Sequence, residues 1–462
     1  QDIFNFKCVK IAAKPSEIVV TWITYCPSVL THVKYISGKR KIRIRGNMTQ
    51  YTNGDREYFV HRTLLKRLKP DQIYCNNYSL KSYLQSIFKV YRCGNDNNWS
   101  SMYSFKTLKD GENWSPIISV FGDLDTDHHS LLNLIDDVKK HKFNILYHIG
   151  DFGYEAESNE RSVRDVFYTK IEEITARVAY LTVPVNKEQT KNSSNYNNRF
   201  SMVNVANGEK SNFYYSVNIG TAHIICFSTE FQYSMKKDSK YQIQFEWLKN
   251  DLIAANTIEN RRKRPWIITM AHRPMVCSNY KDECATKRNH MKVSFERLFY
   301  KYGVDLQMWG GGYSYQRFWP FFEFKVRNGS LNEPYKNPKA PVNIITAFDV
   351  QIIIIEYFKT RPIDTTLQRR NKDHLKAVTI NKSGYTRLTV MNRTHLHIEY
   401  VSSSTDEVAD EVMIIKTFHG SYNSKSNLLT PNWYTRTLIC SFAFLLSKNI
   451  KKVIEFFTIL LF

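Results

Sequence analysis

The sequence contains no Cys-x-x-Cys pair, no apolar run long enough to cross a bilayer and no internal repeat. The first absence argues against a zinc ribbon, although the chain has eight cysteines. Two apolar runs near the carboxyl end, 437–446 and 453–462, each fall short of the roughly 18–20 residues of a membrane-spanning helix. We therefore expect no membrane span, and we interpret residues 421–462 as an amphipathic surface segment or a non-native tail.

Acidic residues are also scarce. The 462 residues include 43 Asp and Glu against 65 Lys and Arg, a formal net charge of +22. Such a balance invites a nucleic-acid or anionic-surface interpretation. The cations are spread along the whole chain, however, and the densest cluster, 261–264, could equally be a solvated loop. We therefore expect no nucleic-acid partner.

The cysteines and the asparagines bear on the compartment. Cys277 and Cys284 flank a short segment that a disulfide could close. Together with several Asn-x-Ser/Thr patterns, the cysteines favour a secreted or lysosomal glycoprotein. The chain begins at Gln1 without a signal-like segment, as expected if a signal peptide has been removed or if the chain is a fragment. The glycosylation patterns begin at Asn47, Asn98, Asn192, Asn328, Asn381 and Asn392.

Residues 1–108 are predicted to form a small β-sandwich. Short strand-like runs at 17–22, 33–36 and 41–45 are separated by turn signals such as Asn53-Gly54-Asp55. Residues 76–89 interrupt this pattern with apolar residues at helical spacing, and we interpret them as an insertion.

From residue 109 onward, apolar strand-like runs alternate with amphipathic helices, which predicts a layered α/β domain. We place this domain at 109–350 and its carboxyl-terminal part at 351–420. The predicted helices are 131–142, 161–176 and 241–255, and the predicted strands are 117–121, 145–149, 178–183, 222–227, 266–270, 304–309, 341–345, 386–390, 395–401 and 412–415.

Two of these strands are followed by Gly-Asp, which places Asp123 and Asp151 at strand ends. The carboxyl ends of parallel strands share one edge of a sheet, so the two carboxylates can point at one place. Two confined carboxylates repel unless a cation lies between them. A single Gly-Asp pair is usually a turn or a helix cap. Two of them at the ends of apolar strands favour a metal site.

Five short motifs follow one another along the α/β part. They are Gly-Asp-Leu-Asp (122–125), Gly-Asp-Phe-Gly-Tyr (150–154), Val-Pro-Val-Asn-Lys-Glu (183–188), Ala-His-Arg-Pro-Met (271–275) and Trp-Gly-Gly-Gly-Tyr-Ser-Tyr-Gln-Arg (309–317). In this order the chain resembles the purple acid phosphatases, binuclear metallohydrolases of the calcineurin-like phosphoesterase superfamily. The resemblance runs from about Pro15 to Gly420. It implies a fibronectin-like β-sandwich followed by a metallophosphoesterase α/β sandwich.

The resemblance also implies a ferric ion beside a divalent iron, zinc or manganese ion. Carried over by position, Asp123, Asp151 and Tyr154 would bind the ferric ion, with Asp151 bridging. Asn186 and His272 would bind the divalent metal. Hard oxygen donors suit ferric iron, whereas an amide and an imidazole suit a divalent ion. In the family such a pair of metals hydrolyses phosphate monoesters, and members often dimerise, so a homodimer is one expectation.

The chain departs from the family pattern at this centre. Gly311 and Tyr313 stand where two metal-binding histidines belong, and Lys187 replaces a histidine that faces phosphate, so no catalytic residue is intact. Changes to residues that only support metal ligands typically cost ~10–100-fold, and losing ligands should cost more. We expect phosphatase activity to be impaired or lost. The alternatives are a working acid phosphatase, a secreted pseudoenzyme that binds a partner or phosphate, and a product without function.

Two residues could supply substitute ligands. Asp125 stands where related phosphoesterases have a histidine ligand, and residues i and i+2 share a face if the strand continues. We hypothesise that Asp125 replaces the donor lost at position 313; the alternative is that it caps the next helix. Tyr313 could offer a phenolate, on a longer and differently shaped side chain. His148, within a strand, is expected to be a packed histidine.

Overall fold

The computed structural model describes residues 4–11, 15–27, 30–37, 40–53, 56–74, 91–95, 98–124, 130–152, 167–184, 194–202, 211–232, 239–277, 290–312, 314–348 and 373–423. The predicted insertion at 76–89 and nearly all of the segment 421–462 lie outside these residues.

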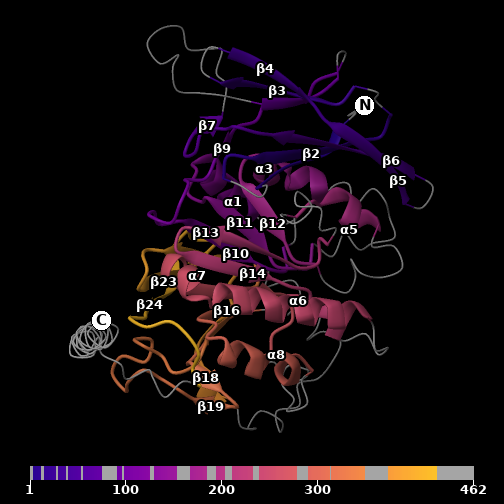
Figure 1. The fold of residues 1–462 in the computed structure, drawn as a ribbon. Helices are drawn as coiled ribbons and strands as arrows, with labels where there is room; N and C mark the ends of the chain where they lie inside the picture. Colours follow the sequence, from indigo (N-terminus) through magenta and orange to yellow (C-terminus); the bar gives the residue numbers. More distant parts are fainter. Residues whose placement is uncertain are drawn as a thin grey trace, which may run out of the picture. The chain divides into compact units, whose positions relative to one another are not determined.

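The amino-terminal strands form two facing sheets, as the sequence predicts. Trp22 and Leu65 from one sheet pack against Val33, Tyr35 and Tyr91 from the other, because alternate residues of each strand point into the space between them. Figure 1 shows these strands in the indigo part of the ribbon. The four-stranded sheet has the spatial order β1 (Phe4–Ile11), β2 (Ile18–Thr24), β6 (Arg56–Leu65), β5 (Asn47–Asn53). The three-stranded sheet has the order β4 (Arg40–Arg45), β3 (His32–Ser37), β8 (Tyr91–Gly94). A separate pair is formed by β7 (Ile73–Tyr74) and β9 (Phe105–Lys106).

The rest of the described chain contains two larger mixed sheets. In the first, β10 to β12 are parallel and β22 to β24 are antiparallel. Its order is β12 (Ala179–Thr182), β11 (Ile145–His148), β10 (Ile117–Phe121), β22 (Gly384–Val390), β23 (His395–Ser402), β24 (Val408–Ile415). The second sheet runs β13 (Tyr215–Ile219), β14 (Ala222–Cys226), β15 (Trp266–Ala271), β16 (Leu306–Trp309), β20 (Val342–Ile345), β17 (Tyr315–Phe318), β21 (Lys376–Ile380), with β14, β15, β16 and β20 parallel.

Helices cover the sheets. Leu252 of α6 (Ser239–Ala255) and Phe295 of α8 (His290–Lys301) pack against Ile225 and Ile267 of the second sheet, and Figure 1 shows both helices beside it. Tyr385 of β22 donates a hydrogen bond to Asp137 of α1 (Ser130–Lys139) on the first sheet. In the described part of the chain, no helix has the length and apolarity needed to cross a bilayer. The shorter elements are α3 (Glu172–Thr175), α5 (Ser194–Arg199), α7 (Ile258–Lys263), η3 (Glu230–Gln232), η6 (Asp373–Leu375), and the strand pair β18 (Phe321–Phe322) and β19 (Lys325–Val326).

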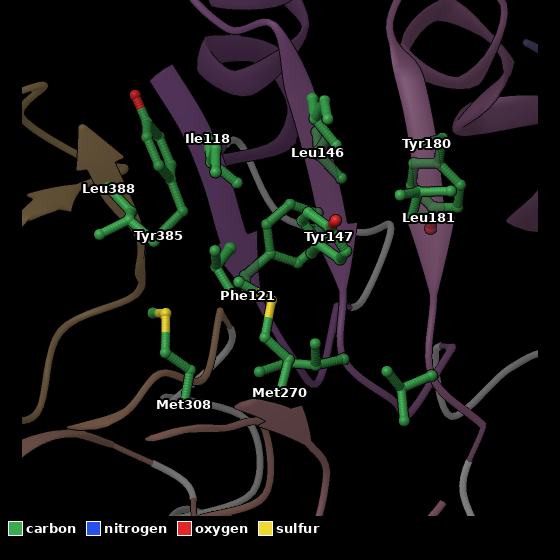
Figure 2. Packing of buried hydrophobic residues seen from close by; sticks show 14 of the residues in the cluster. Ile118, Phe121, Leu146, Tyr147, Tyr180, Leu181, Met270, Met308, Tyr385 and Leu388 are labelled. Atoms are coloured by element: carbon green, nitrogen blue, oxygen red, sulfur yellow. The ribbon is translucent and has the colours of Figure 1, made fainter. Parts of the chain in front are cut away.

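The main core contains residues of both large sheets. Figure 2 shows Phe121 and Tyr147 of the first sheet close to Met270 and Met308 of the second, all of them buried. Polar contacts join this domain to the β-sandwich: Tyr91 donates to the carbonyl of Ala176 at 2.7 Å. The fold is therefore the predicted one, a β-sandwich followed by an α/β sandwich whose two sheets face each other.

Candidate metal centre

The two predicted aspartates lie side by side at the ends of adjacent parallel strands. In the β10–β11 pair, Phe121 is opposite His148. The amide of Asp123 donates to the carbonyl of Gly150 at 3.0 Å, and the amide of Leu124 donates to that of Asp151 at 3.3 Å. Both aspartates adopt left-handed backbone conformations, with φ of 53° and 58°. Such conformations are costly for non-glycine residues and concentrate at functional sites.

Glycines allow the two large sheets to touch at this edge. A Cβ added to Gly122 would lie 2.6 Å from the Cα of Gly310, and one added to Gly310 would lie 2.1 Å from the carbonyl oxygen of Ile149. Neither position therefore accepts a side chain. The amide of Gly310 also donates to the carbonyl of His272 at 3.0 Å. This close crossing brings His272, at the end of β15, to the two aspartates at the ends of β10 and β11.

His272 is oriented as a metal ligand. Its Nδ1–H donates to the carbonyl of Ile149 at 3.0 Å, which leaves the Nε2 lone pair to coordinate. Burial lowers the pKa of His272, against the opposing pull of Asp151 and Glu230. A lowered pKa favours the neutral imidazole, the form that binds metals.

The donor set fits one metal ion. Ligand atoms of Asp123, Asp151 and His272 all lie within 4.8 Å of one another. Oδ1 of Asp151 is buried and has no hydrogen-bond partner among the described residues. A buried carboxylate oxygen without a donor is energetically costly, and a bound cation would remove that cost. Two carboxylates and one imidazole are suitable ligands for iron, zinc or manganese.

His148 holds the backbone of Asp151 in place through a hydrogen bond. Its Nε2–H donates to the carbonyl of Asp151 at 3.1 Å, and its Nδ1 accepts from the hydroxyl of Tyr180 at 2.6 Å. Burial lowers the pKa of His148 to about 3, so the ring stays neutral. The histidine is therefore packed within the strand, as predicted, and supports a ligand rather than acting as one.

Gly311 faces the cluster without offering a donor. A Cβ at this position would lie 3.0 Å from Nε2 of His272. The remaining predicted site residues lie outside the described residues, and their roles stay predictions. They are Tyr154, Asn186, Lys187, Asp125 and Tyr313.

Sequence reasoning missed an ion pair next to His272, in which the carboxylate of Glu230 is buried and Arg273 is partly exposed. Oε1 of Glu230 accepts from Nε of Arg273 at 2.7 Å, while Oε2 is buried without a hydrogen-bond partner in the described chain. The carboxylate acts on the neighbouring imidazole by opposing the drop in its pKa. The available signal was Ser-Thr-Glu at 228–230, shortly after β14, the parallel neighbour of β15.

The predicted modification sites differ in exposure. Asn328 is half-buried, and Asn192 lies outside the described residues. Cys277 is buried and disulfide-bonded, whereas Cys284 is not among the described residues, so their pairing stays a prediction. The exposed acceptor asparagines are Asn47, Asn98, Asn381 and Asn392.

Comparisons with known proteins agree with this architecture. Residues 117–311 match the calcineurin-like phosphoesterase family, and residues 364–411 match the iron/zinc purple acid phosphatase-like protein C family. Acid phosphatase type 7 of Mus musculus is 36% identical over 88% of this chain and 90% of its own length. A probable inactive purple acid phosphatase 9 of Arabidopsis thaliana is 27% identical over 73% of this chain and 56% of its own.

A solved structure shares the fold. The purple acid phosphatase from yellow lupin seeds superimposes with a TM-score of 0.69 at 20% identity, over 89% of this chain and 74% of that one. Three observations point to the same family: the strand-end aspartates, the histidine after β15, and the long match to acid phosphatase type 7. The chain belongs to the purple acid phosphatase family of calcineurin-like metallophosphoesterases.

Proposed function

We propose that this chain keeps the phosphate-ester site of its family in a reduced form, with one metal ion held by Asp123, Asp151 and His272 and with phosphate-monoester hydrolysis impaired or lost. The proposed site is a reduced form of the binuclear metal centre that the family implies, and the described residues supply one group of possible metal ligands. The alternative is a secreted pseudophosphatase that binds phosphate or a partner without turnover. A relative whose name includes "probable inactive" makes loss of activity a reasonable outcome within this family.

One observation carries the proposal. Position 311 faces the open coordination side of His272 at 3.0 Å, measured from the Cβ that a side chain would have there. The residue present is glycine, so nothing extends from that position to a second metal. With the family's other late histidine replaced by Tyr313, the family's two-metal centre loses one imidazole ligand from each metal.

The remaining residues can still orient a phosphate ester. A bound metal ion would polarise a phosphoryl oxygen and lower the pKa of a bound water. Asp123 and Asp151 would hold such an ion at the strand ends, and the hydrogen bond to Ile149 fixes the His272 ring. Arg273, next in sequence and pinned by Glu230, adds a cation near the site. These groups bind and orient, but they do not replace a second metal.

Metal analysis combined with a chromogenic phosphate-ester assay tests the proposal. We expect about one metal ion per purified chain, and turnover at least about 100-fold below that of mouse acid phosphatase type 7 assayed in parallel. Asp151→Asn should abolish metal binding, because it removes the charge of a ligand. Asp137→Asn is the matched control: it alters another buried carboxylate, which lies on helix α1 and is bonded to Tyr385, and it should keep the metal. Two metal ions per chain with rapid turnover would contradict the proposal, and so would a purified chain without any bound metal.

We also propose that the chain is secreted or lysosomal. The support is the set of exposed acceptor asparagines and the disulfide at Cys277. Enzymatic deglycosylation of the chain made in animal cells should increase its electrophoretic mobility; unchanged mobility would count against this location.

A further inference from the structure

The three-stranded sheet of the β-sandwich carries a predominantly basic outer face. Strands β3, β4 and β8 contain six Lys or Arg residues and no Asp or Glu. Their apolar residues, including Val33, Tyr35 and Tyr91, point to the core on the other side. The outer face therefore combines the cations of three adjacent strands. We call it the basic face and define it by Lys34, Lys41, Arg43, Arg45 and Arg92.

Strand register places these cations in rows. Lys34 of the central strand is opposite Arg43 on one side and opposite Arg92 on the other. Directly opposed residues lie on the same side of a sheet, and like charges in that arrangement destabilise it. The register therefore sets three cations side by side on the outer face, where one anionic chain can contact them together.

The edge strand supplies a second row. Lys41, Arg43 and Arg45 alternate along β4 and are exposed. Alternate residues of a strand lie roughly 6.5–7 Å apart, so the three cations span about 13 Å. That spacing suits a chain with repeated anionic groups better than it suits a single phosphate.

An aromatic residue that contacts the basic face, Trp99, favours one class of polyanion. The ring of Trp99 is covered by Nζ of Lys34 at 3.9 Å and by the guanidinium of Arg92 at 4.9 Å. A ring covered by cations offers little stacking surface to nucleic-acid bases. Among the large apolar side chains of β3 and β4, Ile36 alone shares this face, so the face lacks apolar anchors for a membrane.

We infer that the basic face of β3, β4 and β8 binds a sulfated polysaccharide chain outside the cell. The inference relies on the proposed secreted or lysosomal location, and it is independent of the metal centre. Charge complementarity carries it: the exposed cations of β4, flanked by the half-buried Lys34 and Arg92, match a linear polyanion, and the net charge of +22 adds long-range attraction.

Heparin is the probe. The full chain should bind it, with affinity falling steeply as salt rises. The triple variant Lys41→Gln/Arg43→Gln/Arg45→Gln should bind roughly 100-fold more weakly at low salt, by analogy with cations at an anionic surface. The slope of log affinity against log salt should flatten by about 2 to 3. The matched control Lys240→Gln/Arg262→Gln/Lys263→Gln removes three exposed cations from α6 and α7, and should change affinity less than about 3-fold.

A single charge reversal separates binding from folding. Arg43→Glu places a carboxylate opposite Lys34, which favours the sheet, yet it should weaken heparin binding by about 10-fold or more. Equal losses in the two triple variants would overturn the inference, since they would reflect net charge alone. Binding of duplex DNA or of phosphatidylserine vesicles as tight as that of heparin would overturn the choice of a sulfated chain. Metal content is measured on the same samples. A loss of heparin binding with unchanged metal content then reports on the basic face and not on the metal centre.

Discussion

The double variant Gly311→His/Tyr313→His should raise phosphomonoester turnover by more than about 100-fold. It returns two imidazoles to the positions where the family pattern has them. A Cβ at 311 lies 3.0 Å from Nε2 of His272 and 3.3 Å from its Cε1, so the new side chain points at the existing ligand. His272 must move by a few tenths of an ångström to admit it. Two imidazoles could then share one divalent ion.

Metal content and rate should rise together. We expect the metal stoichiometry of the double variant to increase from about one to about two ions per chain, because a second site gains its ligands. The control Gly311→Ala/Tyr313→Phe adds the same Cβ without a nitrogen donor, and should increase neither quantity. A double variant that folds but gains no metal would show that these two positions are not what limits the centre.

The strand ends of this centre could be predicted from the sequence, because each involves a local pattern. An apolar run followed by Gly-Asp marks where β10 and β11 end, and Asp123 and Asp151 meet as expected. His272 came from a motif rather than from its own surroundings. Its hydrogen bond to Ile149 joins residues 123 positions apart, and no local pattern contains such a pairing.

The glycines show the limit of local patterns. Gly122 and Gly310 are needed because two backbones cross with no room for a side chain. In the sequence they are indistinguishable from turn glycines. Helix α8 and strands β17 and β21 were also missed. For β17 the reason is related: it contains Arg317, whose charge is matched by a carboxylate far along the chain. Arg317 binds both oxygens of Asp410 on β24.

Asp305 interrupts an apolar strand pattern in the sequence, yet it stabilises the folded structure. It lies within the run 304–309, which the sequence predicts as a strand, and β16 begins just after it at Leu306. The side chain is fully buried, and Oδ2 accepts from the amide of Ile267 at 2.9 Å. Its charge is matched by two cations from far along the chain. Lys416, just after β24, contacts Oδ1, and Arg261 of α7 lies 3.3 Å from Oδ2.

Replacing Asp305 by Asn should lower the free energy of unfolding by about 3–5 kcal/mol, because it leaves buried cations without a counter-charge. Burial alone would raise the pKa of Asp305, but Lys416 and the other nearby cations outweigh it and hold the pKa well below its ordinary range. A pKa that is lower in the folded state contributes stability that is complete above the unfolded value of about 3.9 and is lost as pH falls below it. The deficit of the variant should therefore be constant from pH 8 to about 5 and shrink below about 4.

Urea titration across this pH range measures the deficit. Asp406→Asn is the control: that carboxylate is 54% exposed and 3.7 Å from Lys142, so its loss should cost less than about 1 kcal/mol. Adding Lys416→Met to Asp305→Asn should recover part of the stability, since it removes one of the unmatched charges. If Asp305→Asn costs no more than the surface control at pH 7, the cluster does not tie β24 and α7 to β16, and the carboxylate is there for another reason.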